Sequence, residues 1–273
     1  MPSFPSKAML LAAGLGERLR PLTLTTPKPL IPIGDHLLIE YNLILLKKFG
    51  IKKVMINLHY LGDKIKTTLG DGKKYGLKLH YNEEKEILGT GGGIKNVEGF
   101  FGNETFIVMN ADVLIDVDLK KMWDQHQQNS NTATLVLSPA DRKDVKRLVY
   151  IDKNKKILSI AEKGPQENSK GYVFTGVQIL EPEVLKQLPP HPNPWHRRHG
   201  VPLPPGERVS NLKSCIVQDS YIPLLHQKAK LGGFVCDQYF RDLGTPERYE
   251  EVKKEFIQAW PYTTLKPEDF TSE

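Results

Sequence analysis

Cysteine is nearly absent from this sequence. Its 273 residues include two cysteines, Cys215 and Cys236. Two cysteines cannot build the disulfide framework of a small secreted domain, and their spacing matches none of the paired patterns of zinc sites. We therefore expect a protein of a reducing compartment, and assign it to the cytoplasm.

Long hydrophobic runs are also absent. A membrane-spanning helix needs about 20 consecutive apolar residues, and the apolar run at residues 8–13 is far shorter. Glu17 and Arg18 follow it closely, which does not fit the small-residue cleavage site of a signal peptide. We expect no membrane segment, and interpret this run as a buried first strand.

Charge of one sign is not concentrated anywhere in the chain. The formal net charge is +6 and 26% of the residues are charged, but no Lys/Arg block or aromatic-and-basic repeat is present. This composition argues against a nucleic-acid surface and suits small phosphate-bearing anions. With 39% hydrophobic residues, the chain can form an ordinary globular core.

Short apolar runs alternate with amphipathic stretches through the first half of the chain. Such alternation predicts an α/β fold with a doubly wound, mostly parallel sheet. A turn at Lys153-Asn154 between two strand-like runs then predicts an antiparallel hairpin. The expected strands cover residues 8–12, 53–57, 77–81, 106–109, 132–138, 148–152, 156–162 and 172–180, and the expected helices residues 37–49, 63–69, 118–128, 217–228 and 245–256.

A glycine-rich segment follows the first strand. It reads LAAGLGERLRPLT over residues 11–23 and continues with PKPL at 27–30. Glycines bring bare backbone N–H groups close to phosphate oxygens. The planar guanidinium of Arg18 can donate two hydrogen bonds to such oxygens, and the ammonium of Lys28 adds a compact positive charge. The dinucleotide-binding fingerprint would need a third glycine where Leu19 stands, and the Walker Gly-Lys-Ser/Thr is missing. The segment predicts a phosphate-binding loop of another kind.

Two aspartates follow apolar stretches in a similar way. Asp112 comes directly after the strand at 106–109, and Asp242 follows the apolar and aromatic residues 234–240. In parallel-sheet proteins, ligand sites lie at the carboxyl ends of the strands. Two carboxylates can share a hard cation such as Mg²⁺ with phosphate oxygens, although either aspartate alone would also suit a turn or a helix cap.

Six motifs together resemble the sugar-1-phosphate nucleotidyltransferase family. They are the glycine-rich segment with PKPL, EILGTGGG at 86–93, NAD at 110–112, EK at 162–163, FTG at 174–176 and DLGTPERY at 242–249. The first half is especially similar to mannose-1-phosphate guanylyltransferases and N-acetylmuramate 1-phosphate uridylyltransferases. The resemblance implies a Rossmann-like nucleotidyltransferase fold with a small antiparallel sugar-binding portion. It also implies transfer of a nucleoside monophosphate from a nucleoside triphosphate to a sugar 1-phosphate.

The resemblance assigns roles to individual residues. Arg18, Lys28, Asp112 and Asp242 would be catalytic, and Asp112 and Asp242 would hold Mg²⁺. Glu162 and Lys163 would bind the sugar hydroxyls and the sugar phosphate, with the backbone of Thr175 and Gly176 against the sugar. The nucleotide would contact Leu11, Ala12, Ala13, Gly14, Leu15, Gly16, Glu17, Arg18, Lys28, Gly89, Thr90 and Gly91.

The same resemblance divides the chain. Residues 1–260 would form one nucleotidyltransferase domain, with a nucleotide-binding part at about 7–140 and a sugar-binding part at about 141–240. Residues 261–273 would form a tail. The His-, Arg- and Pro-rich loop at 189–208 has little counterpart in short relatives, and we interpret it as a surface insertion. His196 and His199 have no Cys or acidic cluster beside them, so they do not predict a zinc site.

Some positions depart from the family pattern. Ala111 stands where relatives commonly have Gly, Gly164 replaces a proline after Lys163, and Arg147 stands where many relatives have Gly. Two alternatives therefore stay open: an inactive homologue that binds nucleotide-sugar and regulates a partner, and a cytidylyltransferase that acts on an alcohol phosphate. The base, the sugar and the oligomeric state, monomer or homodimer, are not fixed by these motifs.

Overall fold

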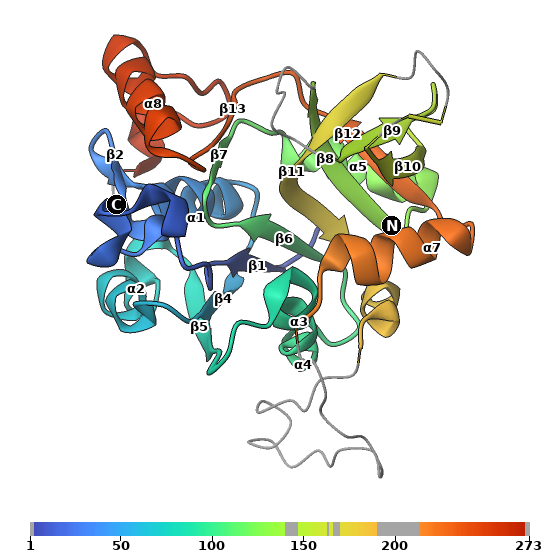
Figure 1. The fold of residues 1–273 in the computed structure, drawn as a ribbon, viewed down its shortest axis with the longest axis horizontal. Helices are drawn as coiled ribbons and strands as arrows, with labels where there is room; N and C mark the ends of the chain where they lie inside the picture. The colour runs from blue at the N-terminus through green and yellow to red at the C-terminus, as the bar shows by residue number, and fades with distance from the viewer. Residues whose placement is uncertain (1–2, 140–146, 163, 166–169, 190–212, 271–273) are drawn as a thin grey trace.

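The central feature of the fold is a nine-stranded mixed sheet (Figure 1). The computed structural model describes residues 3–139, 147–162, 164–165, 170–189 and 213–270. The strands of this sheet are β1 (Lys7–Leu11), β4 (Lys53–Leu58), β5 (Lys78–Glu83), β6 (Phe106–Asn110), β8 (Ala133–Pro139), β9 (Leu148–Ile151), β10 (Ile157–Ala161), β11 (Gly171–Leu180) and β12 (Leu231–Val235). The two smaller sheets contain β2 (Pro32–Ile33), β3 (His36–Leu37), β7 (Val113–Ile115) and β13 (Phe240–Asp242).

Four parallel strands form one half of the sheet, as the alternating pattern in the first half of the chain predicts. They lie in the order β6-β1-β4-β5, with β1 between β4 and β6. Strand β11 then runs antiparallel to β6, and β9 and β10 form the expected hairpin beside β11. The chain therefore has the α/β fold with a mostly parallel central sheet and an antiparallel portion that the sequence predicts.

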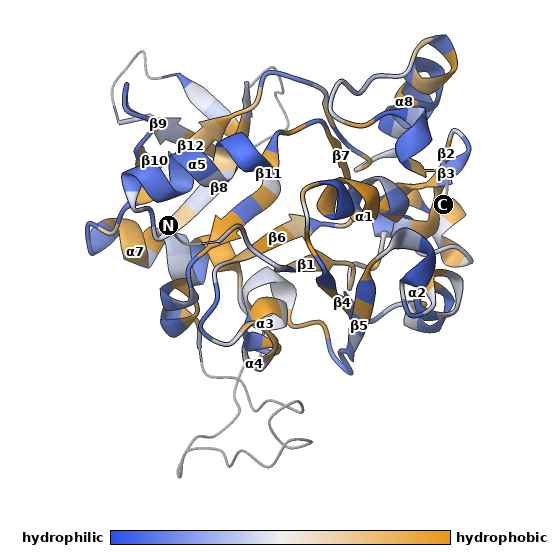
Figure 2. Ribbon diagram, turned by 180° about the vertical axis from the view of Figure 1, so that it is seen from behind, coloured by the Kyte–Doolittle hydropathy of each residue, from blue (hydrophilic) through white to orange (hydrophobic). Residues whose placement is uncertain are grey.

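Both faces of the inner parallel strands β1, β4 and β6 are buried over most of their length, which explains why these strands are mainly apolar. In β1, Ala8 and Leu10 belong to one hydrophobic cluster, whereas Met9 between them belongs to the other. Successive side chains of a strand point to opposite faces, so each strand contributes to both clusters. In Figure 2, β6 is mainly hydrophobic, whereas the surface helices α5 (Leu119–Asn129) and α8 (Pro246–Gln258) are largely hydrophilic.

Helices cover the two faces of this sheet. Helix α1 (Leu38–Lys48) packs into the cluster that contains Leu10, and α3 (Gly89–Lys95) and α4 (Glu98–Phe101) pack into the cluster that contains Met9. This arrangement is the double winding that the alternating pattern predicts. Further helical segments are α2 (Gly62–Leu69), a π-helical turn at Val217–Tyr221 and α7 (Ile222–His226). Among the described residues, no helix is long and apolar enough to cross a membrane.

The predicted starts of two helices agree with the structure. The Asp118 carboxylate accepts hydrogen bonds from Lys120 N and Lys121 N at the start of α5. Thr245 Oγ1 accepts one from Arg248 N at the start of α8, and Pro246 occupies the first helical position. These caps satisfy backbone donors that an α-helix leaves free at its first turn.

The C-terminal residues correct the expectation of a tail. Tyr262 and Leu265 are buried in the core, and a 3-10 helix spans Pro267–Phe270. The fully buried Asp116 carboxylate accepts hydrogen bonds from Thr263 N (2.7 Å), Thr263 Oγ1 (2.6 Å) and Thr264 N (2.9 Å). This segment therefore packs onto the domain as far as Phe270.

Candidate active site

A cavity of 570 Å³ lies where the order of the parallel strands reverses, between β1 and β6. Doubly wound sheets bind ligands at such a switch point, outside the carboxyl ends of the strands, because the loops there diverge to opposite faces. The lining residues come from five separate stretches of chain: Leu11, Ala12, Ala13, Gly14, Leu15, Gly16, Glu17, Arg18, Leu19, Lys28, Pro29, Asn57, Glu84, Ile87, Gly89, Thr90, Asn110, Asp112 and Gly244.

The glycine-rich segment forms one wall of this cavity. After β1 it makes a first 3-10 turn at Glu17–Leu19, which starts from Gly16 in the left-handed region at φ 64°. The buried Thr23 fixes this turn, because its hydroxyl donates a 2.7 Å hydrogen bond to the Gly16 carbonyl. A side chain at Gly16 would be strained by its φ and crowded by Thr23, which explains the second glycine.

The second glycine run forms a helix, α3, and not the flexible turn that its composition also allows. Gly91 N donates to Ser214 O at 2.9 Å, and a Cβ at Gly91 would lie 2.7 Å from Ser214 Oγ. The helix therefore packs directly on the segment around Ser214. Of the three predicted contacts in this run, Gly89 and Thr90 line the cavity, whereas Gly91 is buried against Ser214 and does not.

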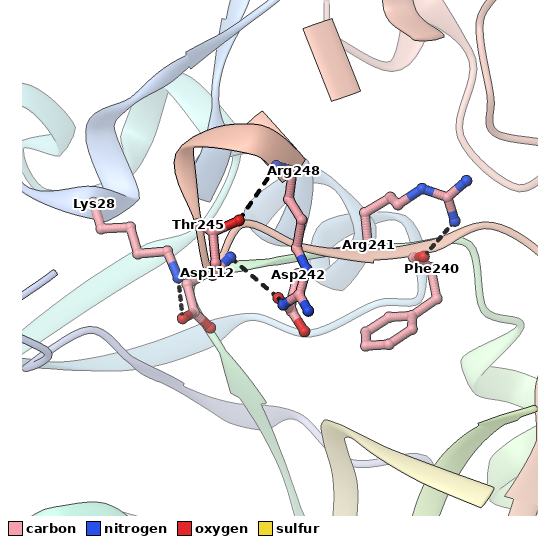
Figure 3. Close-up of polar contacts among 8 residues, drawn as sticks. Lys28, Asp112, Phe240, Arg241, Asp242, Thr245 and Arg248 are labelled. Atoms are coloured by element: carbon pink, nitrogen blue, oxygen red, sulfur yellow. Dashed lines mark hydrogen bonds and ion pairs between the residues drawn. The ribbon is translucent and has the colours of Figure 1, made fainter. Parts of the chain in front are cut away.

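The two predicted aspartates lie near each other, Asp112 in the turn directly before β7 and Asp242 at the end of β13. Strands β7 and β13 pair antiparallel with Asp242 opposite Val113, the residue after Asp112, and Leu243 N donates to Asp112 O at 3.3 Å. Each carboxylate faces a cation: Lys28 Nζ lies 2.6 Å from Asp112 Oδ2, and Arg248 Nη1 lies 2.6 Å from Asp242 Oδ1 (Figure 3). Residues 130 positions apart are thus brought together, as the motif pattern predicts.

A buried polar network links the two glycine runs, and the sequence reasoning missed it. Ala12 N donates to Asn57 Oδ1 (2.8 Å), Asn57 Nδ2 donates to Glu84 Oε1 (2.7 Å), and Leu88 N donates to Glu84 Oε2 (3.1 Å). Burial raises the pKa of the Glu84 carboxyl, and the hydrogen bonds from Asn57 and Leu88 oppose this shift. The network joins the end of β1 to the start of α3, and its Ala12, Asn57 and Glu84 line the cavity.

One available signal would have found Asn57. It stands near the end of an apolar strand, β4, as Asp112 stands just after β6. Asn110 and Gly244 also line the cavity beside the predicted aspartates. Nothing in the sequence marks Glu84 among the other acidic residues near it.

The structure describes only some of the residues that the sequence predicts to bind the sugar phosphate. Glu162 lies just after β10 and is exposed. Thr175 is buried, and its hydroxyl donates a hydrogen bond to Val136 O. Neither residue lines the cavity. Gly176 has φ 85°, and a Cβ there would lie 2.4 Å from Asn110 Nδ2, so this glycine makes room for a cavity residue. Lys163 and almost all of the loop at 189–208 lie outside the described residues.

Ala111 does not crowd the cavity. It is fully buried within a core cluster and is not a lining residue, and its N–H donates to Leu11 O at 3.0 Å. We expect Ala111→Gly to reduce the free energy of unfolding by about 1 kcal/mol through a lost buried methyl and added chain entropy. Turnover should change less than about threefold, since the group removed does not reach the cavity. Urea unfolding and steady-state kinetics would test both; a tenfold gain in turnover would show that the methyl obstructs the site.

The donor set near the cavity fits a magnesium ion shared with substrate. Mg²⁺ is usually held by one or two carboxylates together with waters and substrate phosphates. Asp112, in the turn before β7, and Asp242, on the strand that pairs with β7, provide two such carboxylates. Across the described ranges no cluster of three or more His, Cys, Asp or Glu side chains could hold a metal by protein groups alone. The geometry thus suits an ion that arrives with phosphate oxygens.

Comparison with known proteins agrees with this geometry. A family model described as nucleotidyl transferase matches residues 7–259. The chain belongs to the nucleotidyl transferase family. The resemblance drawn from the six motifs is therefore confirmed at the level of the family.

Individual relatives of this nucleotidyl transferase differ in their substrates. The chain is 31% identical to a mannose-1-phosphate guanylyltransferase of Mycobacterium tuberculosis, over 92% of the chain and 65% of that protein. It is 37% identical to an N-acetylmuramate alpha-1-phosphate uridylyltransferase of Neisseria meningitidis over 66% of the chain and 77% of that protein. A crystal structure of HddC from Yersinia pseudotuberculosis with GMP-PN superimposes with a TM-score of 0.70 and 26% identity, covering 92% of the chain and 100% of the other. The chain thus spans less than two thirds of the length of the mycobacterial relative, and 51% of the length of another curated relative.

Proposed function

We propose that this protein transfers a nucleoside monophosphate from a nucleoside triphosphate to a sugar 1-phosphate. The observation that carries the proposal is the cavity at the strand switch point. It gathers the glycine-rich loop, Arg18, Lys28 and Asp112, with Asp242 on the neighbouring strand. Cationic side chains and backbone N–H groups at one end of a cavity suit the phosphates of a triphosphate.

In the proposed reaction an oxygen of the sugar phosphate attacks the α-phosphorus in line, and the bond to the β-phosphate breaks. The products are a nucleoside diphosphate sugar and pyrophosphate. The attacking phosphate is already anionic, so no side chain needs to act as a general base. Mg²⁺ bound by Asp112 and Asp242 would neutralise charge on the α-phosphate.

The side chains contribute position and charge. Arg18, on the exposed turn of the glycine-rich loop, is placed to hold the departing pyrophosphate. Lys28 is largely buried beside Asp112, which keeps its ammonium at the cavity wall. Electrostatic groups fixed before the reaction stabilise the developing charge without reorganisation at the moment of transfer.

The preferred substrates are GTP with mannose 1-phosphate, or UTP with N-acetylmuramate 1-phosphate. The first pair is supported by a guanylyltransferase relative that aligns with 92% of the chain, and by a structural neighbour solved with GMP-PN. The second is supported by a uridylyltransferase relative with higher identity over a shorter region. We further propose that the reaction takes place in the cytoplasm.

A grid of GTP, UTP, dTTP, CTP and ATP against mannose, glucose and N-acetylmuramate 1-phosphates, read as pyrophosphate release with Mg²⁺, tests this function. One clearly preferred pair would support the proposal. Binding of nucleotide-sugar without pyrophosphate from any pair would favour the inactive regulatory homologue. Phosphocholine is added to the grid as a further acceptor, and activity only with CTP and phosphocholine would favour the cytidylyltransferase.

A further inference from the structure

The chain segment that leads to Lys28 is held from one side by the start of helix α2. Tyr60 OH donates a 3.0 Å hydrogen bond to Leu24 O, and Lys64 Nζ donates a 2.6 Å hydrogen bond to Thr25 O. Tyr60 lies just before α2 and Lys64 lies in its first turn, and this helix runs beside the segment (Figure 1). The two carbonyl groups come four and three positions before Lys28. The start of α2 therefore fixes the chain shortly before Lys28 joins the cavity wall.

Packing against α2 does little to hold residues 24–27. A surface pocket of 460 Å³ lies between the two, lined by residues 25–27 of the segment and by Thr67 and Thr68 of α2. The 3-10 turn at Leu22–Leu24 leaves its two leucine side chains 37% and 52% exposed. Within the described structure, the two hydrogen bonds are therefore the main tie between these residues and the helix.

The chain between the held carbonyls and Lys28 is stiff. Lys28 stands between Pro27 and Pro29, and Pro27 has φ −63°. A proline ring fixes its own φ and restricts the residue before it, which for Pro29 is Lys28 itself. Leu30 N then closes a 3-10 turn by donating a 2.8 Å hydrogen bond to Pro27 O. A shift of the backbone at Thr25 is therefore passed on to Lys28, because few torsions between them can absorb it.

The backbone position of Lys28 decides where its charge lies. Its Nζ is 2.6 Å from Asp112 Oδ2, and its side chain is 11% exposed. A lysine stem is flexible, so a fixed backbone and a close partner together hold the ammonium at one point. Electrostatic catalysis depends on charge placed beforehand, and a displacement of about 1 Å can lower a rate up to about 100-fold.

We propose that Tyr60 and Lys64 are positioning residues that hold the backbone before Lys28 and thereby place its ammonium in the cavity. This inference rests on the proposed function, because it takes Lys28 as a cation of the active site. Neither Tyr60 nor Lys64 lines the cavity, so both act through the segment and not on the substrate. Loss of their hydrogen bonds should lower turnover and leave the binding of the sugar phosphate unchanged.

The first measurement is amide hydrogen exchange of the full chain without substrate. Tyr60→Phe and Lys64→Met each remove one donor and keep most of the side chain. The amides of Leu30 and Ile31, which close the turn around Lys28, should exchange about fivefold faster in each variant, the scale of losing one hydrogen bond. Lys64→Arg keeps a donor and should exchange like the wild type. Unchanged exchange in both Tyr60→Phe and Lys64→Met would overturn the proposal, whatever the activity.

The second measurement is turnover with the preferred substrates of the grid. The double variant Tyr60→Phe/Lys64→Met should lose about tenfold in kcat, with KM for the sugar phosphate changed less than about twofold. In a Lys28→Ala background the same two substitutions should cost nothing further, because they act through Lys28. Wild-type turnover of the double variant, or full additivity with Lys28→Ala, would overturn the proposal. Normal turnover of Lys28→Ala alone would instead contradict the role that the proposed function gives Lys28, whereas the exchange rates depend only on the two contacts.

Tyr81→Phe is the matched control. Tyr81 OH donates a 2.6 Å hydrogen bond to Gly70 O at the other end of α2, and Tyr81 does not line the cavity. The variant loses the same kind of bond from the same helix, so its thermal midpoint should fall about as much as that of Tyr60→Phe. Its turnover, and its exchange at Leu30 and Ile31, should stay at wild-type values. If Tyr81→Phe lowered turnover as much as Tyr60→Phe, the effect would be one of overall stability and the proposal would fail.

Discussion

Replacing Asp112 by Asn, or Lys28 by Ala, will lower turnover at least about 100-fold, the scale of losing one electrostatic stabiliser at an active site. The Asn side chain keeps the size of Asp112 and removes its charge, so both the ion pair with Lys28 and the proposed metal ligand are lost. Lys28→Ala removes the other half of the pair and a cation from the cavity wall. Initial rates of pyrophosphate release with the preferred substrates are the measurement.

Lys66→Ala is a suitable control for Lys28→Ala. Lys66 forms an ion pair with Glu83 at 2.9 Å on the protein surface and does not line the cavity. Its replacement should change turnover less than about twofold, because exposed pairs contribute little. If Asp112→Asn and Lys28→Ala both retained near-normal turnover, the proposed mechanism would be wrong.

Replacing Asp116 by Ala will lower the free energy of unfolding by about 3 kcal/mol or more. This fully buried carboxylate accepts three hydrogen bonds from Thr263 and Thr264, and two of the donors are backbone N–H groups that cannot turn elsewhere. Removing this buried acceptor leaves three part-buried donors without their partner, which costs more than the hydrogen bonds contribute when they are made. Urea unfolding followed by circular dichroism would measure the change.

Thr263→Val separates the hydroxyl from the backbone bonds. It removes the 2.6 Å bond from Thr263 Oγ1 and keeps the N–H bonds of residues 263 and 264. We expect a loss of about 1 kcal/mol, since a single hydrogen bond is removed and a similar side-chain shape remains. If Asp116→Ala cost no more than Thr263→Val, the C-terminal segment would not depend on this carboxylate.

Sequence patterns predicted the parallel strands well because their cause is local. The inner strands β1, β4 and β6 are buried on both faces, so an apolar run marks each of them without knowledge of its neighbours. The caps Asp118 and Thr245 were predictable for the same reason, because a cap involves side chains and N–H groups a few positions apart. The carboxylates Asp112 and Asp242 were found through motifs, and the structure places Asp112 directly before β7 and Asp242 on the strand that pairs with β7.

Other features depend on contacts between distant residues, which no local pattern records. The run at 89–93 is rich in a poor helix former, yet it is helical because Ser214 leaves no room for side chains and accepts a hydrogen bond from it. The segment at 261–270 reads as a polar tail until Asp116, far earlier in the chain, is seen to bind it. Glu84 gains its place from Asn57 and Leu88 in the same way.

The pairing of β7 with β13 has a consequence for how the protein acquires its site during synthesis. Strand β7 ends at Ile115, whereas its partner begins at Phe240, so a ribosome must add more than 120 residues before the pair can close. A nascent chain can form the parallel strands and the glycine-rich loop early, because these use residues before 111. A product released before residue 240 would hold Lys28 and Asp112 without Asp242. Contacts of such long sequence separation form late in folding. Asp242 therefore reaches its place beside Asp112 only when nearly the whole chain has folded.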